Sequence, residues 1–353
     1  MKKTLLLCFI HGFKGGEDTF GTGFPEHLRQ LVAEELPKVD VRVVVYPKYE
    51  TRGDLAECVD RFRDWLLEKV IDIEVNSGTP SPTIDPSVRT ILIGHSMGGI
   101  VAAETVMALT SERPIQPAGS AKTAAATAAA DAARRPTSPS LTSLMFPYVQ
   151  GLLAFDTPFL GISPGVKKKN AAAAAGADGG GAWGRWGKVA MFAGAGAALA
   201  VGGAAAYMNR EQITQGLGWA SSHLEFVGCL ARGEELKRRV AYLSRARSEL
   251  GVGFGNLYTR LGKAAPSKQV SMAGTVVGNK RTFCNLPAKA AAGTWLEAVN
   301  DAATDETLAH TTMFEPAQNP GYEKLAHDAA GLISSWTRNE WYDSSAEQPD
   351  LLM

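Results

Sequence analysis

The stretch GHSMGG, residues 94–99, carries the residue types that acyl-transfer chemistry needs. Ser96 stands between Gly94 and Gly98, which is the G-x-S-x-G spacing of a serine nucleophile on a sharp turn. The apolar run 88–93 (VRTILI) precedes it and predicts a buried strand, and a helical pattern follows. Glycines on both sides leave room for a tight reversal where a Cβ would collide. The alternative is a strand–turn–helix junction that contains a serine by chance, and the context favours the nucleophile.

A second stretch predicts where the oxyanion of such a reaction would be bound. Residues 11–16 (HGFKGG) follow the apolar run 4–10 and predict a polar, glycine-rich turn. An oxyanion hole uses two backbone amides, one of them from the residue after the nucleophile. We therefore expect the amides of Phe13 and Met97 to form this hole. His11 is expected to hold the turn through a structural hydrogen bond and not to act as the base.

The first residues admit two interpretations, because two lysines and an apolar run also begin a secretory signal peptide. No A-x-A cleavage pattern follows residue 10, and the next residues are polar and glycine-rich. This favours a buried strand over residues 4–10 and an intracellular protein that is not secreted. Removal of residues 4–13 is then expected to abolish folding and not merely to change targeting.

Short apolar runs alternate with helical patterns along the chain, as expected for βαβ units in a mainly parallel sheet. Strands are predicted over residues 4–10, 41–46, 88–93, 151–155 and 252–258. Helices are predicted over residues 24–36, 54–73, 100–109 and 320–336, with Asp54 as an N-cap. The predicted fold class is α/β.

Two insertions interrupt this alternation and divide the predicted domain into the parts 1–160 and 235–353. Residues 113–143 are rich in Ala, Pro, Ser and Thr and predict a low-complexity loop. Residues 161–234 contain a biased linker and the uncharged segment 189–208. Its length suits a membrane span, but its Ala and Gly gain little from lipid. Strands predicted on both sides of it argue against a single crossing, so it either contacts a bilayer or packs over the domain as a helix.

Three stretches resemble the α/β-hydrolase superfamily, in its lipase-like serine esterase branch, and are similar to fungal members of that branch. They are FIHGFKGG (9–16), ILIGHSMGGIVAAE (91–104) and LLAFDTPFLG (152–161). The resemblance covers the first 160 residues closely and the rest in outline. It implies a three-layer α/β-hydrolase fold, a Ser–acid–His triad and hydrolysis of an ester or thioester. It also implies that the insertion after residue 160 occupies the position of a helical lid over an acyl-binding pocket.

The resemblance implies a catalytic histidine on a loop after the last strand and before the final helix. His310, within TLAHTTMFEPAQNPGY, meets that description, since Pro316 and Pro320 mark irregular backbone before the terminal helix. His327 falls inside that helix and is expected to be structural or exposed, while His95 beside the serine is expected to pack. His310 is therefore the expected base.

The catalytic acid stays open among four residues. No Asp or Glu lies between residues 251 and 287, where the family most often has its acid. Some lipases carry it after the preceding strand, which nominates Asp156, although this residue also suits an Asx-turn at a strand exit. The alternatives are Asp301, Asp305 and Glu306, which lie just before the expected base and also suit solvated loop residues or helix caps.

The overall composition excludes some classes of function. The chain has 353 residues, with 36 Lys+Arg and 36 Asp+Glu, and its formal net charge is zero. Because nucleic-acid-binding domains carry a basic excess, no nucleic-acid partner is expected. The four cysteines are scattered, without CxxC or Cys/His spacing. Neither a metal site nor a disulfide framework is therefore expected, and no cofactor is implied.

Together these residues predict a serine hydrolase that cleaves the carboxylic ester of a lipid-like or other apolar acyl substrate. The predicted triad is Ser96, His310 and Asp156, with contact to a membrane surface through residues 189–208. Two alternatives stay open. One is a catalytically silent hydrolase fold used as a binding or membrane-associated module, and the other is a protein thioesterase with the same triad.

Overall fold

The computed structural model describes residues 2–13, 15–21, 23–49, 54–111, 141, 144–164, 166, 228–265, 281–289 and 294–345. Segment 189–208 and most of the two predicted insertions lie outside the described residues, as does the lid inferred from the resemblance. Among the helices that the structure describes, none is both long enough and apolar enough to cross a bilayer.

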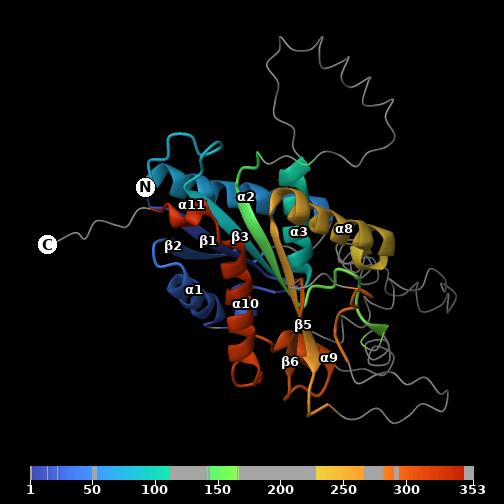
Figure 1. Ribbon diagram of the computed structural model, residues 1–353. Helices are drawn as coiled ribbons and strands as arrows, with labels where there is room; N and C mark the ends of the chain where they lie inside the picture. Colours follow the sequence, from blue (N-terminus) through green and yellow to red (C-terminus); the bar gives the residue numbers. More distant parts are fainter. Residues whose placement is uncertain are drawn as a thin grey trace, which may run out of the picture.

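A single parallel sheet organises the described chain (Figure 1). Every pair of neighbouring strands in it runs in the same direction. The strands, in their order across the sheet, are β2 (Asp40–Val45), β1 (Thr4–Ile10), β3 (Val88–His95), β4 (Val149–Phe155), β5 (Gly253–Leu261) and β6 (Trp295–Asn300). The predicted strands at 4–10, 41–46, 88–93, 151–155 and 252–258 are thus found with small shifts of their ends.

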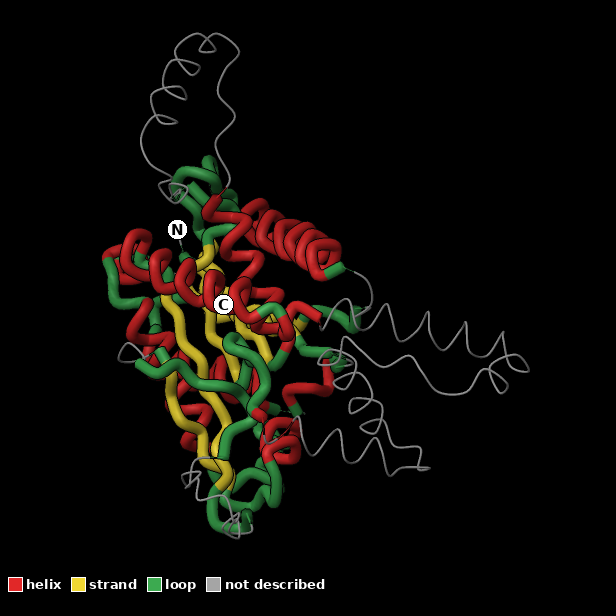
Figure 2. Tube along the Cα trace, turned by 90° about the vertical axis from the view of Figure 1, so that its right-hand side faces the viewer, coloured by secondary structure: helices red, strands yellow, loops and turns green. Residues whose placement is uncertain are grey.

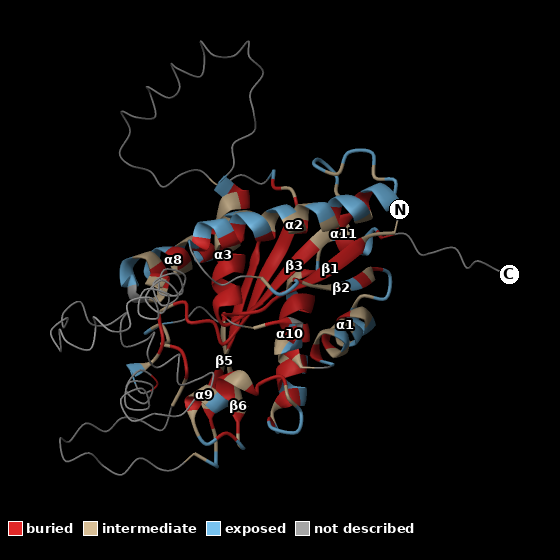
Figure 3. Ribbon diagram, turned by 180° about the vertical axis from the view of Figure 1, so that it is seen from behind, coloured by how far each residue is buried: buried red, intermediate tan, exposed pale blue. Residues whose placement is uncertain are grey.

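Helices cover both faces of the sheet, and the central strands between them are buried, while the edge strands β2 and β6 are only partly buried (Figures 2 and 3). One face packs on α2 (Leu55–Asn76), α3 (Met97–Ser111) and α8 (Gly233–Leu250), and the other on α1 (Phe24–Glu35) and α10 (Tyr322–Trp336). Strand β1 supplies alternate residues to the two cores, because successive side chains of a strand point to opposite faces. Leu6, Cys8 and Ile10 join the first core, while Leu5, Leu7 and Phe9 join the second. The predicted three-layer α/β architecture is confirmed.

Short elements complete the described chain: η1 (Glu17–Phe20), η2 (Cys229–Ala231), α9 (Glu306–Thr311) and α11 (Glu340–Asp343). All four cysteines are buried thiols. Because every strand is parallel, the carboxyl ends of the strands meet at one edge of the sheet, and functional groups of α/β proteins gather at that edge. The residues that follow β1, β3 and β4 are His11, Ser96 and Asp156.

Candidate functional site

The turn between β3 and α3 carries Ser96 in the left-handed backbone region, with φ of 56°. Its amide donates to the carbonyl of Phe155 at 3.0 Å, which ties the turn to the end of the neighbouring strand. A Cβ on Gly94 would stand 2.4 Å from the backbone of Gly99, and one on Gly98 would stand 2.1 Å from the Ile10 carbonyl oxygen. The glycines predicted at 94 and 98 therefore allow the tight turn for a steric reason.

The loop after β1 lies directly against this turn. A Cβ on Gly12 would stand 2.7 Å from Cβ of Ser96 and 3.2 Å from the Met97 nitrogen. The Tyr49 hydroxyl donates to the His11 carbonyl at 2.8 Å, and the two rings stack with centroids 4.5 Å apart. His11 is buried, and its Nδ1 lies 3.0 Å from the Gly12 carbonyl oxygen. This is the kind of structural hydrogen bond predicted for His11.

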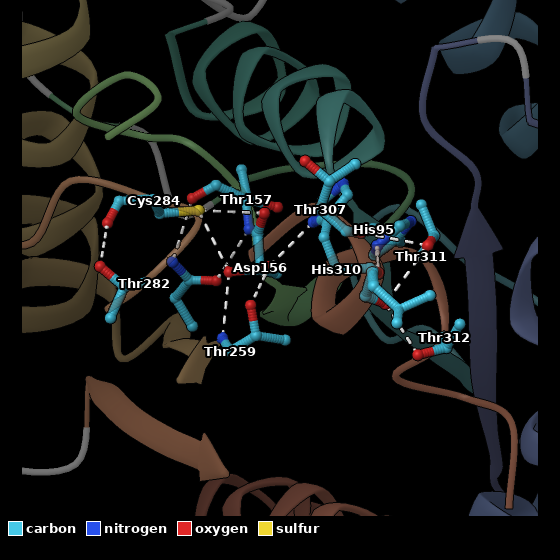
Figure 4. A network of polar contacts seen from close by, with 12 residues as sticks. His95, Asp156, Thr157, Thr259, Thr282, Cys284, Thr307, His310, Thr311 and Thr312 are labelled. Atoms are coloured by element: carbon cyan, nitrogen blue, oxygen red, sulfur yellow. Dashed lines mark hydrogen bonds and ion pairs between the residues drawn. The ribbon is translucent and has the colours of Figure 1, made fainter. Parts of the chain in front are cut away.

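The histidine and the carboxylate come together across a sequence separation of 154 residues. His310 Nδ1 lies 2.8 Å from Asp156 Oδ2, and both side chains are buried (Figure 4). Since a carboxylate only accepts, Nδ1 of His310 is the donor in this bond. His310 is on the short helix α9, so the predicted loop is wrong in detail. The helix forms because Asp305 caps it, its side chain accepting from the Leu308 amide at 2.9 Å.

Asp156 is the most extensively hydrogen-bonded carboxylate at this edge. Its Oδ1 accepts from the Thr259 amide at 3.0 Å and from the Cys284 thiol at 3.2 Å. Its Oδ2 accepts from the Thr259 hydroxyl and from His310. Four donors thus surround a fully buried charge, which is the arrangement that a buried carboxylate requires. Asp156 also has a positive φ of 45°.

The other three candidate acids have partners elsewhere. Asp301 accepts from the Lys263 amide at 3.1 Å, Asp305 caps α9, and Glu306 forms an ion pair with Arg281 at 2.7 Å. The geometry therefore brings Asp156, and none of these three, to His310 Nδ1.

His95 packs beside the candidate base, as predicted. Its Nε2 lies 3.2 Å from the His310 carbonyl oxygen, and the two ring centroids are 4.5 Å apart. Burial, and after it the proximity of His310, hold the pKa of His95 well below its ordinary value. A neutral His95 can donate from Nε2 to that carbonyl without placing a second positive charge beside the base.

Two further histidines and the Ser96 hydroxyl complete the description of the site. His327 is exposed on α10, as predicted, and His223 lies outside the described residues. Within the described part of the chain, the Ser96 hydroxyl makes no hydrogen bond to His310, although His95 next to it contacts that residue. Such bonds often tighten only when substrate binds.

Several residues of the site carried no signal in the sequence. Thr259 lies within β5, and Cys284 follows a stretch outside the described residues. The side chain of Asn256 binds the backbone of Thr157 twice. Its Nδ2 donates to the Thr157 carbonyl at 3.1 Å, and its Oδ1 accepts from the Thr157 amide at 3.2 Å. The Phe283 ring stacks on His310 with centroids 3.7 Å apart and planes 13° from parallel. These contacts join segments distant in sequence, so only the tertiary structure reveals them.

The described residues contain no group of three or more His, Cys, Asp and Glu side chains arranged to hold a metal ion.

Comparison of the sequence with protein-family models and with curated proteins gives no match. Solved structures with a similar arrangement include phospholipase PlaB from Legionella pneumophila, at 9% identity and TM-score 0.40, covering 94% of this chain and 61% of that one. RedJ thioesterase from Streptomyces coelicolor is similar at 13% identity and TM-score 0.33, over 94% of this chain and 86% of its own. Bacillus licheniformis lipase BlEst2 is similar at 14% identity and TM-score 0.33, over 91% of both chains.

This chain therefore spans less than two thirds of the phospholipase. With TM-scores below 0.5 these matches assign neither a family nor a function to this chain, and the predicted resemblance to fungal members is not shown by them. By name these neighbours are a phospholipase, a thioesterase, a lipase and carboxylesterases. The described chain itself has a three-layer α/β fold, with a parallel sheet and Ser96 on the turn between β3 and α3.

Proposed function

We propose that this chain is a serine hydrolase that cleaves carboxylic esters of apolar acyl substrates through an acyl-enzyme. One observation carries the proposal: a buried Asp156–His310 pair joined at 2.8 Å, at the same sheet edge as the strained Ser96 turn. A serine is a weak nucleophile unless a base removes its proton, and the base needs a partner that fixes its tautomer. Asp156 supplies that partner.

In the proposed reaction, His310 Nε2 takes the Ser96 proton as Oγ attacks the acyl carbonyl carbon. Asp156 stabilises the resulting imidazolium, and the backbone amides of Phe13 and Met97 stabilise the oxyanion. His310 then returns the proton to the leaving alcohol. Water, deprotonated by the same histidine, attacks the acyl-enzyme and releases the acid. The close approach of Gly12 to the Met97 amide supports this placement of the oxyanion hole.

A fluorophosphonate probe tests the nucleophile directly. We expect it to label the folded chain at Ser96, and labelling and ester hydrolysis to fall at least about a thousandfold in Ser96→Ala. Ser248→Ala, which changes an exposed serine of α8, is the matched control and should react like the parent. Absence of labelling in the folded parent would contradict the proposed enzymatic function and would favour the alternative of a catalytically silent binding module.

The class of acyl substrate needs a second measurement. The zero net charge favours an uncharged, apolar acyl group over a charged one. We expect p-nitrophenyl esters of increasing chain length to show rising kcat/KM, and oxygen esters to be preferred over matched thioesters. A reversed preference for thioesters would support the protein thioesterase instead.

Contact with a membrane surface through residues 189–208 remains part of the proposal. Flotation with neutral liposomes should recover the parent chain and lose a version without these residues. Equal flotation of the two versions would contradict membrane contact through residues 189–208. It would not affect the proposed hydrolase chemistry.

A further inference from the structure

The segment 281–284 (RTFC) lies beside both the acid and the base and has no part in the proposed chemistry. The Leu261 amide donates to the Arg281 carbonyl at 2.9 Å, and Thr282 forms an antiparallel bridge with Arg260 of β5. Cys284 forms a second bridge, with Ile162 in the segment after β4. The backbone of residues 281–284 is therefore fixed at both ends. We propose that these residues, here called the positioning strap, hold Asp156 and His310 in their productive arrangement.

Cys284 is the contact of the strap with the acid. Its thiol donates to Oδ1 of Asp156 at 3.2 Å and lies 3.1 Å from the carbonyl oxygen of the same residue (Figure 4). Burial, and then the neighbouring carboxylate, raise the pKa of Cys284 well above its ordinary value, so the sulfur keeps its proton. The strap thus supplies one of the four donors to Asp156 and contacts the residue whose backbone is held at positive φ.

Phe283 is the contact of the strap with the base. Its ring lies face to face with the imidazole of His310, at 3.7 Å between centroids, and is itself buried. This contact limits rotation of the imidazole about the axis set by the Asp156 bond. The face of an aromatic ring also attracts a cation, so the contact strengthens when His310 takes up the serine proton. An interaction that is stronger in the charged state accelerates the chemical step.

Arg281 connects the strap to the helix that carries the base. Its guanidinium forms two parallel bonds of 2.7 Å with Glu306, the first residue of α9. Both side chains are largely buried. A bidentate Arg–carboxylate pair fixes orientation as well as distance. The strap therefore holds α9 at its first turn, one turn before His310.

This proposal rests on the proposed hydrolase function, and its test uses the full chain. Phe283→Leu removes the ring, and Phe283→Tyr retains it. We expect kcat for a p-nitrophenyl ester to fall roughly tenfold in Phe283→Leu, the effect of a cation–aromatic contact of ordinary strength, with KM nearly unchanged. Phe283→Tyr should stay close to the parent. The acidic limb of the kcat/KM profile should move to lower pH in Phe283→Leu, because the charged base loses a favourable contact.

Other charged groups around the base must remain in place for that shift to be informative. The titratable groups in contact with His310 among the described residues are Asp156 and His95, and Glu306 with Arg281 lies one turn earlier on α9. Phe62→Leu is the matched control, since Phe62 is a fully buried ring in the α2 core. It should cost similar stability and leave kcat and the pH profile unchanged.

A double-variant cycle separates positioning from general loosening of the fold. If Phe283 acts through His310, Phe283→Leu should have no further effect on the residual rate of His310→Ala. Should Phe283→Leu fail to fold, Phe283→Met keeps more of the side-chain volume, and Cys284→Ala tests the contact with the acid. Cys284→Ala should also lower kcat without raising KM.

Two results have different meanings. If the parent is active and Phe283→Leu, Phe283→Met and Cys284→Ala keep its kcat and pH profile, the strap does not position the pair, and the proposal is overturned. If the parent neither labels at Ser96 nor hydrolyses the ester, the hydrolase function itself fails.

Discussion

At the scale of single residues, Ser96 and Asp156 share an uncommon backbone state. They are the two non-glycine residues with positive φ that are found in the described part of the chain, at 56° and 45°. Such conformations cost about 1–3 kcal/mol each and persist where surrounding contacts hold them. Ser96 is held by the Phe155 carbonyl and Asp156 by the Leu257 carbonyl. The molecule thus keeps strain at the two residues that we propose as nucleophile and acid.

The sequence predicts one of these two conformations and not the other. Gly94 and Gly98 predict the tight turn at Ser96, because the sequence itself shows that these positions have no side chain. Asp156 stands between Phe155 and Thr157, with no glycine beside it, and its turn depends on bonds from β5. For the same reason the sequence alone does not decide among the four candidate acids, since the choice requires knowing which carboxylate contacts His310.

The identity of the acid can be tested by a change of one atom type. Asp156→Asn replaces the carboxylate by an amide of nearly the same shape, which removes the negative charge and turns one acceptor oxygen into a donor nitrogen. It should lower kcat by about 10³–10⁴-fold, because the imidazolium loses its counter-charge and the histidine its tautomer. The measurement is ester hydrolysis at neutral pH.

Asp301→Asn is the control for this change, since Asp301 is bound to Lys263 and not to the base. It should retain parental kcat. A large loss in Asp301→Asn together with an active Asp156→Asn would show that the acid has been assigned to the wrong residue.

At the scale of elements, the buried strands are the part of the fold that the sequence predicts best. Their β-branched and apolar runs mark burial on both faces, as in β1 and β4, where every residue is buried. Strand β6 was not predicted, because it lies at the edge of the sheet and is only partly buried. Helix α8 was not predicted either, since its sequence GEELKRRVAYLSRARSEL is polar and adjoins a biased segment.

One element junction gives a clear steric prediction. A Cβ on Gly98, in the first turn of α3, would stand 2.1 Å from the Ile10 carbonyl oxygen at the end of β1. Because backbone cannot yield as a flexible side chain does, Gly98→Ala should lower the free energy of unfolding by roughly 3 kcal/mol or prevent folding. It should also reduce activity by displacing the 11–13 loop. Urea denaturation and ester hydrolysis measure the two effects.

Gly331→Ala makes the same chemical change in an exposed turn of α10, where no described atom outside the adjacent helix backbone lies within 4 Å of the added methyl. It should raise the free energy of unfolding by about 0.5–1 kcal/mol, since alanine favours the helix. Equal stability of Gly98→Ala and the parent would contradict the tight contact between α3 and β1.

At the scale of the whole molecule, two buried histidines link folding to pH. Burial lowers the pKa of His95 and also that of His11, despite the hydrogen bonds that oppose this at His11. Unfolding exposes both rings and returns them to an ordinary pKa of about 6.5. Below that pH the unfolded chain binds more protons than the folded one, so the free energy of unfolding must fall as the pH falls.

The expected decline is large enough to measure. Each buried histidine contributes up to about 1.4 kcal/mol per pH unit below about pH 6.5. His95→Gln keeps a nitrogen donor near the position of Nε2 for the His310 carbonyl but cannot titrate, so the difference between urea midpoints at pH 7 and pH 5.5 should shrink in this variant. An unchanged difference would mean that His95 is protonated in the folded chain.

The separation of the proposed nucleophile and the proposed base along the chain has a consequence for synthesis. His95, beside the nucleophile, and His310 are 215 positions apart. Under the proposed mechanism, a growing chain contains Ser96 long before His310 is synthesised, and α9 must dock on the end of β4 before hydrolysis can begin. In that mechanism, we expect a nascent chain without α9 to be inactive toward esters, so that ester hydrolysis would report the docking of α9.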